Sequence, residues 1–438
     1  MGGGGRSDIN GLLILRPVGV IATLIGLWSL TREQVRAHRF LFLMAGAIFA
    51  LVVVQLIPLP PTLWHALPGR ALVAQIDQVA LNQDIWRPLT MTPFATWNAF
   101  FSLFIPLAVL VLGVQLTREH HVMLLSVVLA LSAVSGLLGL LQVIGSAESS
   151  LYFYEVTNAG AAVGLFANRN HQAIFLSTVF PMLAVFAYAQ KRGVGQSQIK
   201  IWLAIGGAVL LVPLLLVTGS RSGLLLGMLG LGVAAILSRQ ASVADSSGNG
   251  QTQPKTKKTI RYAIAAGALV VIALVTALMS RAEAITRLLD SDEMNGARLP
   301  MWKTGWDLLF KYFPTGSGFG SITTVFEIDQ PKDNLAPTYV NHLHNDWLET
   351  LVLGGLPAGL LMIIAAVAWS RATIAFFGTK NAIVRDLLLA KLGSIVTLIF
   401  VVASFVDYPL RTPSIACVFV LAAVWLSRHD PRSAKYAA

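Results

Sequence analysis

Residues 201–238 read IWLAIGGAVLLVPLLLVTGSRSGLLLGMLGLGVAAILS, and this stretch decides the fold class. Two long apolar runs flank a short turn, and Arg221 is the only charged residue among them. A helix of about 20 apolar residues spans the hydrocarbon core of a bilayer. The stretch therefore predicts two membrane-spanning helices that meet in a tight turn at 219–221, with Pro213 kinking the first of them.

The same pattern repeats along the chain. Apolar stretches occur at 11–30, 40–57, 97–116, 122–144, 170–189, 199–218, 222–238, 262–280, 347–369, 386–406 and 413–427. Continuous runs of this length favour helices over a closed barrel, whose strands would be segments of about ten residues with alternating polarity. The sequence predicts an all-α polytopic membrane protein with about 11–12 transmembrane helices.

The composition agrees with this fold class. Of the 438 residues, 55% are hydrophobic and 12% are charged, and the mean hydropathy is +0.69. Soluble domains carry about 25% charged residues. The formal net charge of +11 is explained by lysines and arginines in cytoplasmic loops, so we expect no nucleic-acid partner.

The basic loops orient the chain. Those at 31–39, 117–121, 190–200, 239–261 and 370–385, and the tail 428–438, alternate so that they share one side, which we assign to the cytoplasm. Eleven spans place the N-terminus outside, whereas a re-entrant helix near Arg16 and Pro17 would return it inside. Both arrangements remain open at this point.

This topology predicts three parts. Residues 1–280 form N-terminal transmembrane helices with a disordered cytoplasmic link near 241–256. Residues 281–346 form a periplasmic loop with interfacial helices, because RLPMWKTGWDLLFKYF at 298–313 interleaves aromatic and charged residues and PTGSGFG at 314–320 forms a turn. Residues 347–438 form C-terminal transmembrane helices.

Polar residues gather at the non-cytoplasmic ends of the predicted spans. They are Asn168, Arg169, Asn170, His171, Arg221, Arg298, Lys303, His342, His344, Asn345, Asp346, Glu349, Asp407 and Arg411. Arginines at span ends often only anchor helices, and acidic residues in a first helical turn often only cap it. Arg221 differs because its turn is too short to leave the membrane, so its charge needs an anionic partner from the protein or a ligand.

These groups suggest a site for a diphosphate. Arginine binds phosphate oxygens in a bidentate manner, and a polyprenyl-diphosphate-linked sugar brings phosphate to this boundary. A histidine titrates near neutral pH and can take the proton of an acceptor hydroxyl, so His344 is the first candidate base and His342 the second. Two histidines and a distant acid supply too few ligands for zinc, and we expect no metal.

Four segments carry a family resemblance. GLFANRNHQA at 164–173, TGSRSG at 218–223, RLPMW followed by FPTGSGFG at 298–320, and HLHNDWLETLVLGGLPAG at 342–359 resemble, in this order, the signature regions of the O-antigen ligase / Wzy polymerase superfamily. The resemblance covers about residues 164–360 directly.

The resemblance implies a GT-C-type glycosyltransferase in the bacterial inner membrane, with its active site facing the periplasm. Such an enzyme uses neither metal nor cofactor and moves a glycan from undecaprenyl diphosphate to an acceptor hydroxyl, with inversion at the anomeric carbon. Arg221 and Arg298 would hold the diphosphate and His344 would be the catalytic histidine. Family members often have proline where this chain has Arg169, so Arg169 is an accessory candidate together with His342, Lys303 and Arg411.

The implied partners are an undecaprenyl-diphosphate-linked glycan, membrane lipid, and an acceptor glycan that is either a lipid-linked repeat unit or the lipid A core. The superfamily includes ligases, polymerases and enzymes that transfer to protein. DYPLRTPS at 407–414 is more similar to the corresponding segment of exopolysaccharide polymerases than to that of ligases, so we favour a polymerase.

Two other function classes remain. A secondary transporter of an anionic solute is the main alternative, although it should show inverted repeats and charges near the middle of spans, and neither is visible. A lipid-binding, non-catalytic partner would explain the arginines but gives no reason for His344.

Overall fold

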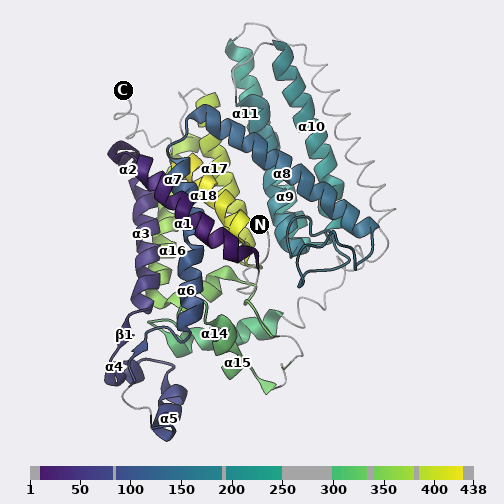
Figure 1. The fold of residues 1–438 in the computed structure, drawn as a ribbon. Coiled ribbons are helices and arrows are strands. Elements are labelled where there is room, and N and C mark those ends of the chain that lie inside the picture. Colours follow the sequence, from purple (N-terminus) through teal and green to yellow (C-terminus); the bar gives the residue numbers. More distant parts are fainter. Residues whose placement is uncertain are drawn as a thin grey trace.

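The computed structural model of the 438-residue chain describes residues 10–81, 85–189, 194–248, 298–332, 335, 339–378 and 384–427. The protein is an all-α polytopic membrane protein (Figure 1). In the described part of the chain, seven helices are long and apolar enough to cross a membrane, and three shorter apolar helices accompany them. The predicted span 262–280 lies outside the described residues.

The described apolar stretches form helices close to the predicted spans. These helices are α1 (Gly11–Ser29), α3 (Arg39–Gln55), α6 (Pro93–Ser102), α7 (Phe104–Gly113), α8 (Arg118–Ile144), α9 (Arg169–Tyr188), α10 (Val194–Val217), α11 (Arg221–Gly248), α16 (Asp346–Gly378), α17 (Val384–Ala403) and α18 (Pro413–Ser427). The predicted span 97–116 is two consecutive helices, α6 and α7. The expected link at 241–256 begins within α11, and residues 249–256 lie outside the described residues.

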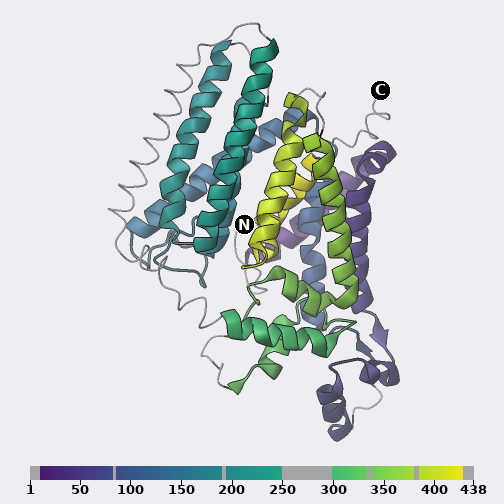
Figure 2. The same cartoon turned by 180° about the vertical axis from the view of Figure 1, so that it is seen from behind.

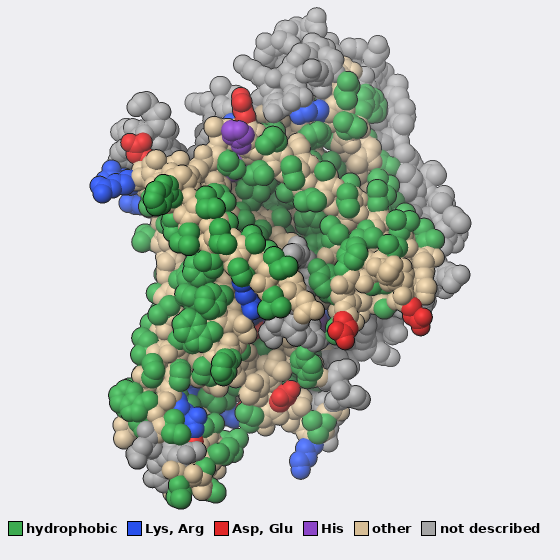
Figure 3. All heavy atoms as spheres, in the orientation of Figure 1, with side chains coloured by type: hydrophobic (Ala, Val, Ile, Leu, Met, Phe, Trp, Pro, Cys, Tyr) green, Lys and Arg blue, Asp and Glu red, His purple; other side chains and the backbone are tan. Residues whose placement is uncertain are grey.

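Smaller elements lie between the long helices. They are α2 (Arg32–Ala37), β1 (Pro58–Leu59), α4 (Pro61–Ala66), α5 (Ala71–Val79), β2 (Arg87–Pro88), α14 (Leu299–Tyr312), α15 (Ile322–Asp329) and the 3-10 turn η3 (Pro409–Arg411). The two strands pair antiparallel. Elements α4, α5, α14 and α15 all lie at one end of the long helices, as both views show (Figures 1 and 2). Hydrophobic side chains dominate the middle of the face in Figure 3.

Helix α9 is the central helix, and nearly all of its side chains are buried. Helix α11 approaches it closely because Gly223 faces Ala173 and Gly230 faces the backbone of Ser177, and a Cβ on either glycine would overlap these atoms. Small residues permit such close packing of membrane helices. The Ser177 hydroxyl also donates to the Gly223 carbonyl at 2.9 Å. This packing aligns the first turn of α11 with the first turn of α9.

Helix α1 runs parallel to α6 and α7. Gly19 contacts Ile105 and Gly26 contacts Val111 and Leu112, so residues further along α1 meet residues further along α7. The described start of α1 therefore lies at the same end of the bundle as the start of α6 and the loop 58–92. Of the two arrangements left open by the sequence, this direction agrees with the one in which α1 is a full span that begins on the side of that loop.

The predicted interfacial helix at 298–313 is present as α14. It lies across the ends of the long helices and packs on the first part of α16 (Figure 2). Leu308, Tyr312, Val325, Leu343 and Val352 belong to the shared hydrophobic core between α14, α15 and α16. The extramembrane segment is thus folded onto the membrane helices rather than standing as an independent domain.

Helix α16 is broken at Gly355, which the sequence analysis does not predict. Gly355 has φ +58° and ψ −148°, so the helix stops and restarts there. The turn at 314–320 fills the break: Ser317 and Gly318 donate their backbone N–H groups to the carbonyls of Val352 and Leu353 at 3.0 and 2.9 Å. Two carbonyls at the break in the helix are thereby satisfied inside the protein.

We predict that Gly355→Ala destabilises the protein strongly. The positive φ disfavours any side chain, and a Cβ would overlap the carbonyl oxygen of Pro314, which is backbone and cannot move aside. Backbone strain alone costs about 1–3 kcal/mol. Thermal unfolding of the purified protein, followed by tryptophan fluorescence, should show a lower midpoint. Gly206→Ala in α10 is the control, because its added Cβ meets nothing within 4 Å. Equal midpoints for both variants would contradict the role of Gly355.

We predict that the end carrying α14 and α15 faces the periplasm. Glu33 in α2 and Glu327 in α15 are both exposed and lie at opposite ends of the bundle (Figure 1). In a background without Cys417, a membrane-impermeant maleimide added to spheroplasts should label Glu327→Cys and leave Glu33→Cys unlabelled until the cells are lysed. Labelling of Glu33→Cys alone in intact spheroplasts would reverse the orientation.

Candidate active site

Asp407 is the centre of a polar cluster at the end of the helix bundle that carries α14 and α15. It lies in the turn between α17 and α18, and its side chain is fully buried. Its Oδ1 lies 3.3 Å from Nδ1 of His344 and 3.5 Å from Nε2 of His171, and it accepts the backbone N–H of Tyr408 at 2.9 Å. Both imidazole nitrogens lie within ion-pair distance of the carboxylate. Neither contact has the angles of a good hydrogen bond.

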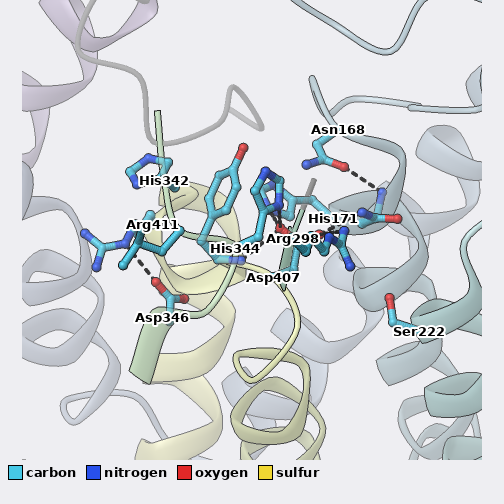
Figure 4. Close-up of polar contacts among 12 residues, drawn as sticks. Asn168, His171, Ser222, Arg298, His342, His344, Asp346, Asp407 and Arg411 are labelled. Carbon is cyan, nitrogen blue, oxygen red and sulfur yellow. Dashed lines mark hydrogen bonds and ion pairs between the residues drawn. The ribbon is translucent and has the colours of Figure 1, made fainter. Parts of the chain in front are cut away.

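The other oxygen of Asp407 faces a different pair of groups. Oδ2 accepts the side-chain amide of Asn170 at 2.8 Å and lies 4.0 Å from a terminal nitrogen of Arg298. One buried carboxylate thus joins α9, the start of α14, the loop before α16 and its own turn. Figure 4 shows His171, Arg298 and His344 gathered around Asp407.

His344 precedes α16 in an unusual backbone conformation. Its φ is +50°, a value that only a few per cent of non-glycine residues adopt. Asn345, which follows it, accepts the backbone N–H of Leu348 with its side chain at 3.0 Å and so caps the helix. The backbone N–H of Asp346 donates to the carbonyl of Ser404 at 2.9 Å, which ties the start of α16 to the end of α17. These contacts hold the His344 ring over Asp407.

His171 is completely buried in the first turn of α9. Its Nδ1 lies 2.9 Å from the hydroxyl of Thr412, and its Nε2 faces Asp407. Both ring nitrogens therefore face groups within the protein. Because the side chain is completely buried, this geometry suits a residue that holds Asp407 in place and does not contact a substrate.

Tyr408 separates the histidines of the cluster. Its ring centroid lies 4.9 Å from that of His171, 4.3 Å from that of His342 and 4.9 Å from that of His344. Burial, and secondarily the charge of Asp407, raises the pKa of Tyr408, so its phenol stays protonated. The tyrosine acts as a neutral spacer between three imidazoles.

A second cluster lies beside the first. Arg411 contacts Asp346 at 2.8 Å and Glu349 at 3.2 Å, and Glu349 also contacts Nδ1 of His342 at 2.9 Å. The other oxygen of Glu349 accepts the backbone N–H of Leu343 at 2.9 Å. Asp346 and Glu349, for which helix capping was a sufficient explanation from the sequence, also form ion pairs with side chains outside α16.

The other residues predicted for the site, Arg221, Arg169 and Lys303, lie on α11, α9 and α14. Arg221 is the first residue of α11 and lies next to Ser222, which Figure 4 draws beside the Asp407 cluster. Arg169 is the first residue of α9, half-buried, and its backbone N–H donates to Asn158 at 3.0 Å. Lys303 is exposed on α14. The fold therefore brings Arg298 and His344 together at Asp407, while Arg411 and His342 belong to the second cluster.

Electrostatics keep Asp407 ionised. Burial opposes the charge of its carboxylate, but the contacts with His171 and His344 outweigh burial and hold the pKa of Asp407 well below its usual range. Burial likewise opposes the charge of Arg411, yet Glu349 and Asp346 together raise its pKa. The site thus holds one permanent anion that faces histidines and an arginine, and one permanent cation that faces two carboxylates.

The chain was compared with models of known protein families. Residues 206–363 match the family model described as O-antigen ligase. This match supports membership of the chain in the O-antigen ligase superfamily. No curated protein matches the chain. The O-antigen ligase match runs from within α10 to within α16, so it includes Arg221, Arg298 and His344 but ends before Asp407.

Sequence reasoning missed the centre of the site. Asp407 and His171 were recognised only as polar residues on the same face, and Tyr408 was not singled out. A signal existed for Asp407, since a carboxylate in a turn between two apolar helices needs a partner just as Arg221 does. The partner's identity depends on how α9, α16 and α17 pack, which one sequence does not reveal.

We predict that Asp407→Ala lowers the free energy of unfolding by about 3–5 kcal/mol, because it leaves the buried groups around it without their anion. Asp329→Ala, which breaks the half-exposed ion pair with Lys311, should cost at most about 1 kcal/mol. Denaturant unfolding in detergent measures both. Equal losses would mean that burial of Asp407 is unimportant.

The lowered pKa also fixes the pH range of this effect. The pKa of a free aspartate is about 3.9. A carboxylate whose pKa is lower than this in the folded state contributes its full stabilisation at pH values above about 3.9. The contribution is lost as the pH falls from there through the folded-state pKa. The part of the difference between wild type and Asp407→Ala that comes from the carboxylate's own ionisation should therefore be lost only in strong acid.

Proposed function

We propose that the protein is a glycosyltransferase of the bacterial inner membrane. It moves a glycan from undecaprenyl diphosphate to a sugar hydroxyl of an acceptor glycan on the periplasmic face, without metal or cofactor. The observation that carries this proposal is the contact between His344 and the buried, ionised Asp407, with Arg298 beside the same carboxylate.

His344 is the proposed catalytic base. Its Nδ1 faces Asp407, so the proton of the neutral imidazole belongs on Nδ1 and the lone pair of Nε2 is available on the opposite edge of the ring. Its side chain is 29% exposed, so a substrate can reach it. The negative charge of Asp407 then stabilises the imidazolium that forms when Nε2 accepts a proton.

His342 is a poorer base in this arrangement. Its Nδ1 is bound to Glu349, its ring packs on Tyr408, and its side chain is only 7% exposed. Arg411 is similarly engaged, because its guanidinium contacts two carboxylates. We assign these two residues to holding the start of α16 and the η3 turn in position, and we do not assign them to substrate.

The proposed step is a single displacement. The acceptor oxygen forms a bond to the anomeric carbon while its proton passes to Nε2 of His344. The bond between the anomeric carbon and the diphosphate oxygen breaks, and its electron pair leaves with the diphosphate. Attack opposite the leaving group inverts the anomeric configuration. Diphosphate leaves as a stable anion, so no general acid is required.

Arg221 and Arg298 are proposed to bind the diphosphate. Arg298 is partly exposed and sits 4.0 Å from Asp407, beyond hydrogen-bond distance, so its donors can turn to a substrate oxygen. Arg221 begins α11, where the positive end of the helix dipole adds to its charge. Arg169, at the start of α9, and Lys303, exposed on α14, are accessory candidates for binding the diphosphate.

We favour a polymerase over a ligase, on the resemblance of the turn at 407–414. A transporter of an anionic solute is the alternative, and the broken helix α16 is a feature that transporters also have. In this protein the free carbonyls of the break are bonded to the turn at 314–320 and to the side chain of Gln55, at 2.9 Å from Leu353. The carbonyls of Val352 and Leu353 at the break are therefore already paired with protein donors, which weighs against their use in ion transport.

The test uses a deletion strain complemented with wild type or His344→Ala. We expect His344→Ala to insert normally but to lower transfer by a factor on the order of 10²–10⁴, the usual value of a positioned base. Single repeat units on the carrier lipid would identify a polymerase, and long unligated chains would identify a ligase. Glu327→Ala, at an exposed position on α15 outside the proposed site, is the control and should keep near-normal transfer.

Two outcomes would contradict the proposal. Full activity of His344→Ala together with loss in His342→Ala would exchange the two roles. Loss of transfer in EDTA that zinc or magnesium restores would refute the metal-free step.

A further inference from the structure

Arg16 is a cationic side chain within α1, which has the smallest buried share of the seven candidate membrane spans in the described residues. Its Nε donates to the hydroxyl of Ser102 at 3.0 Å, and one terminal nitrogen donates to the side-chain oxygen of Asn98 at 2.9 Å. Both partners are neutral and lie on α6. Within the part of the chain that the structure describes, Arg16 forms no ion pair with a carboxylate, in contrast to Arg87 with Asp77 and Arg411 with Asp346.

Arg16 lies beside the apolar surface of α1 that would face lipid. The neighbouring side chains of Leu13, Ile14 and Val18 are exposed apolar groups, as expected for a surface that contacts acyl chains. Arg16 itself is half-buried between this surface and α6. Lys391 offers a contrast: it also bonds to a neutral partner, Gln240 at 3.0 Å, but it is closed off from the surface by burial.

Aromatic residues place this arginine near the membrane boundary. On α6, Phe94 is 89% exposed, Trp97 is 46% exposed and Phe101 is 42% exposed, and they lie beside the two residues that bind Arg16. Tryptophan, unlike phenylalanine, concentrates at the level of lipid headgroups, so Trp97 is the residue that indicates the boundary. The start of α6 also lies at the end of the bundle that carries α14 (Figure 1). Arg16 is therefore within reach of lipid phosphates in the leaflet on that side.

We propose that Arg16 and the amide of Asn98 bind the phosphate of a lipid in this leaflet. A guanidinium has five N–H donors, of which Ser102 and Asn98 take two, so three remain for phosphate oxygens. The NH₂ group of Asn98 adds neutral donors beside them. A charge at this depth without a protein anion is stabilised by an anionic ligand. The site is separate from the Asp407 cluster and does not depend on the proposed reaction.

Native mass spectrometry of the purified, delipidated protein tests this site. The probes are dioleoyl-phosphatidylglycerol, undecaprenyl phosphate, and dioleoylglycerol as a lipid without phosphate. We expect Arg16→Gln to weaken binding of one phosphate lipid by roughly fivefold, the effect of one basic residue near an anionic surface, and to leave dioleoylglycerol unchanged. Selective loss of undecaprenyl phosphate would identify the carrier lipid as the source, and loss of phosphatidylglycerol would identify bulk lipid.

Three controls can overturn the proposal. Arg39→Gln removes an exposed arginine at the other end of the bundle, and an equal loss there would mean a general charge effect. Asp8 is the nearest carboxylate in sequence and lies outside the described residues; if Asp8→Asn matches Arg16→Gln, the cation is paired within the protein. If Arg16→Gln lowers the unfolding temperature equally with and without phosphatidylglycerol, Arg16 only clamps α1 to α6.

Discussion

The carboxylate of Asp407 is a fully buried anion at the membrane boundary, and the polar end of the bundle is built around its neutralisation. A charge removed from water persists only where donors surround it. His171 and Asn170 come from α9, His344 from the loop before α16, and Arg298 from the start of α14. The carboxylate thus fixes the relative positions of four chain segments that are distant in sequence, and it orients the ring that we propose as base.

The loop that carries His344 is held from the other side by the break in α16. The short first part of that helix is anchored by backbone hydrogen bonds to the turn at 314–320, and its start is bonded to the end of α17 through Asp346 and Ser404. Gly316, Gly318 and Gly355 have positive φ values and face neighbouring atoms where no Cβ fits. The glycines of the PTGSGFG and GGLP segments are therefore required by backbone packing, and the chemistry depends on them only through the position of His344.

The sequence predicted the helical membrane fold, the amphipathic helix at 298–313 and the glycine-rich turn after it. It also predicted the approximate positions of the described spans, although α11 and α16 extend 10 and 9 residues beyond the predicted ends at 238 and 369. These features depend on local patterns: the length of apolar runs, the interleaving of aromatic and charged residues, and the spacing of glycines. The break at Gly355 escaped prediction because GG inside an apolar run fits a continuous span equally well. Only the turn that docks there makes the interruption stable.

The same distinction between local pattern and tertiary packing applies to the candidate site. The sequence by itself determined which residues are chemically able to act, because charged and titratable groups such as Arg221, Arg298 and His344 are rare in so apolar a chain and stand at span ends. Tertiary structure alone decided which of them work together: it paired His344 with Asp407 and turned His342 and Arg411 toward Glu349. The physical reason is that apolar periodicity specifies which segments are buried in lipid, whereas a buried charge is matched only when separate helices bring its partners within contact distance.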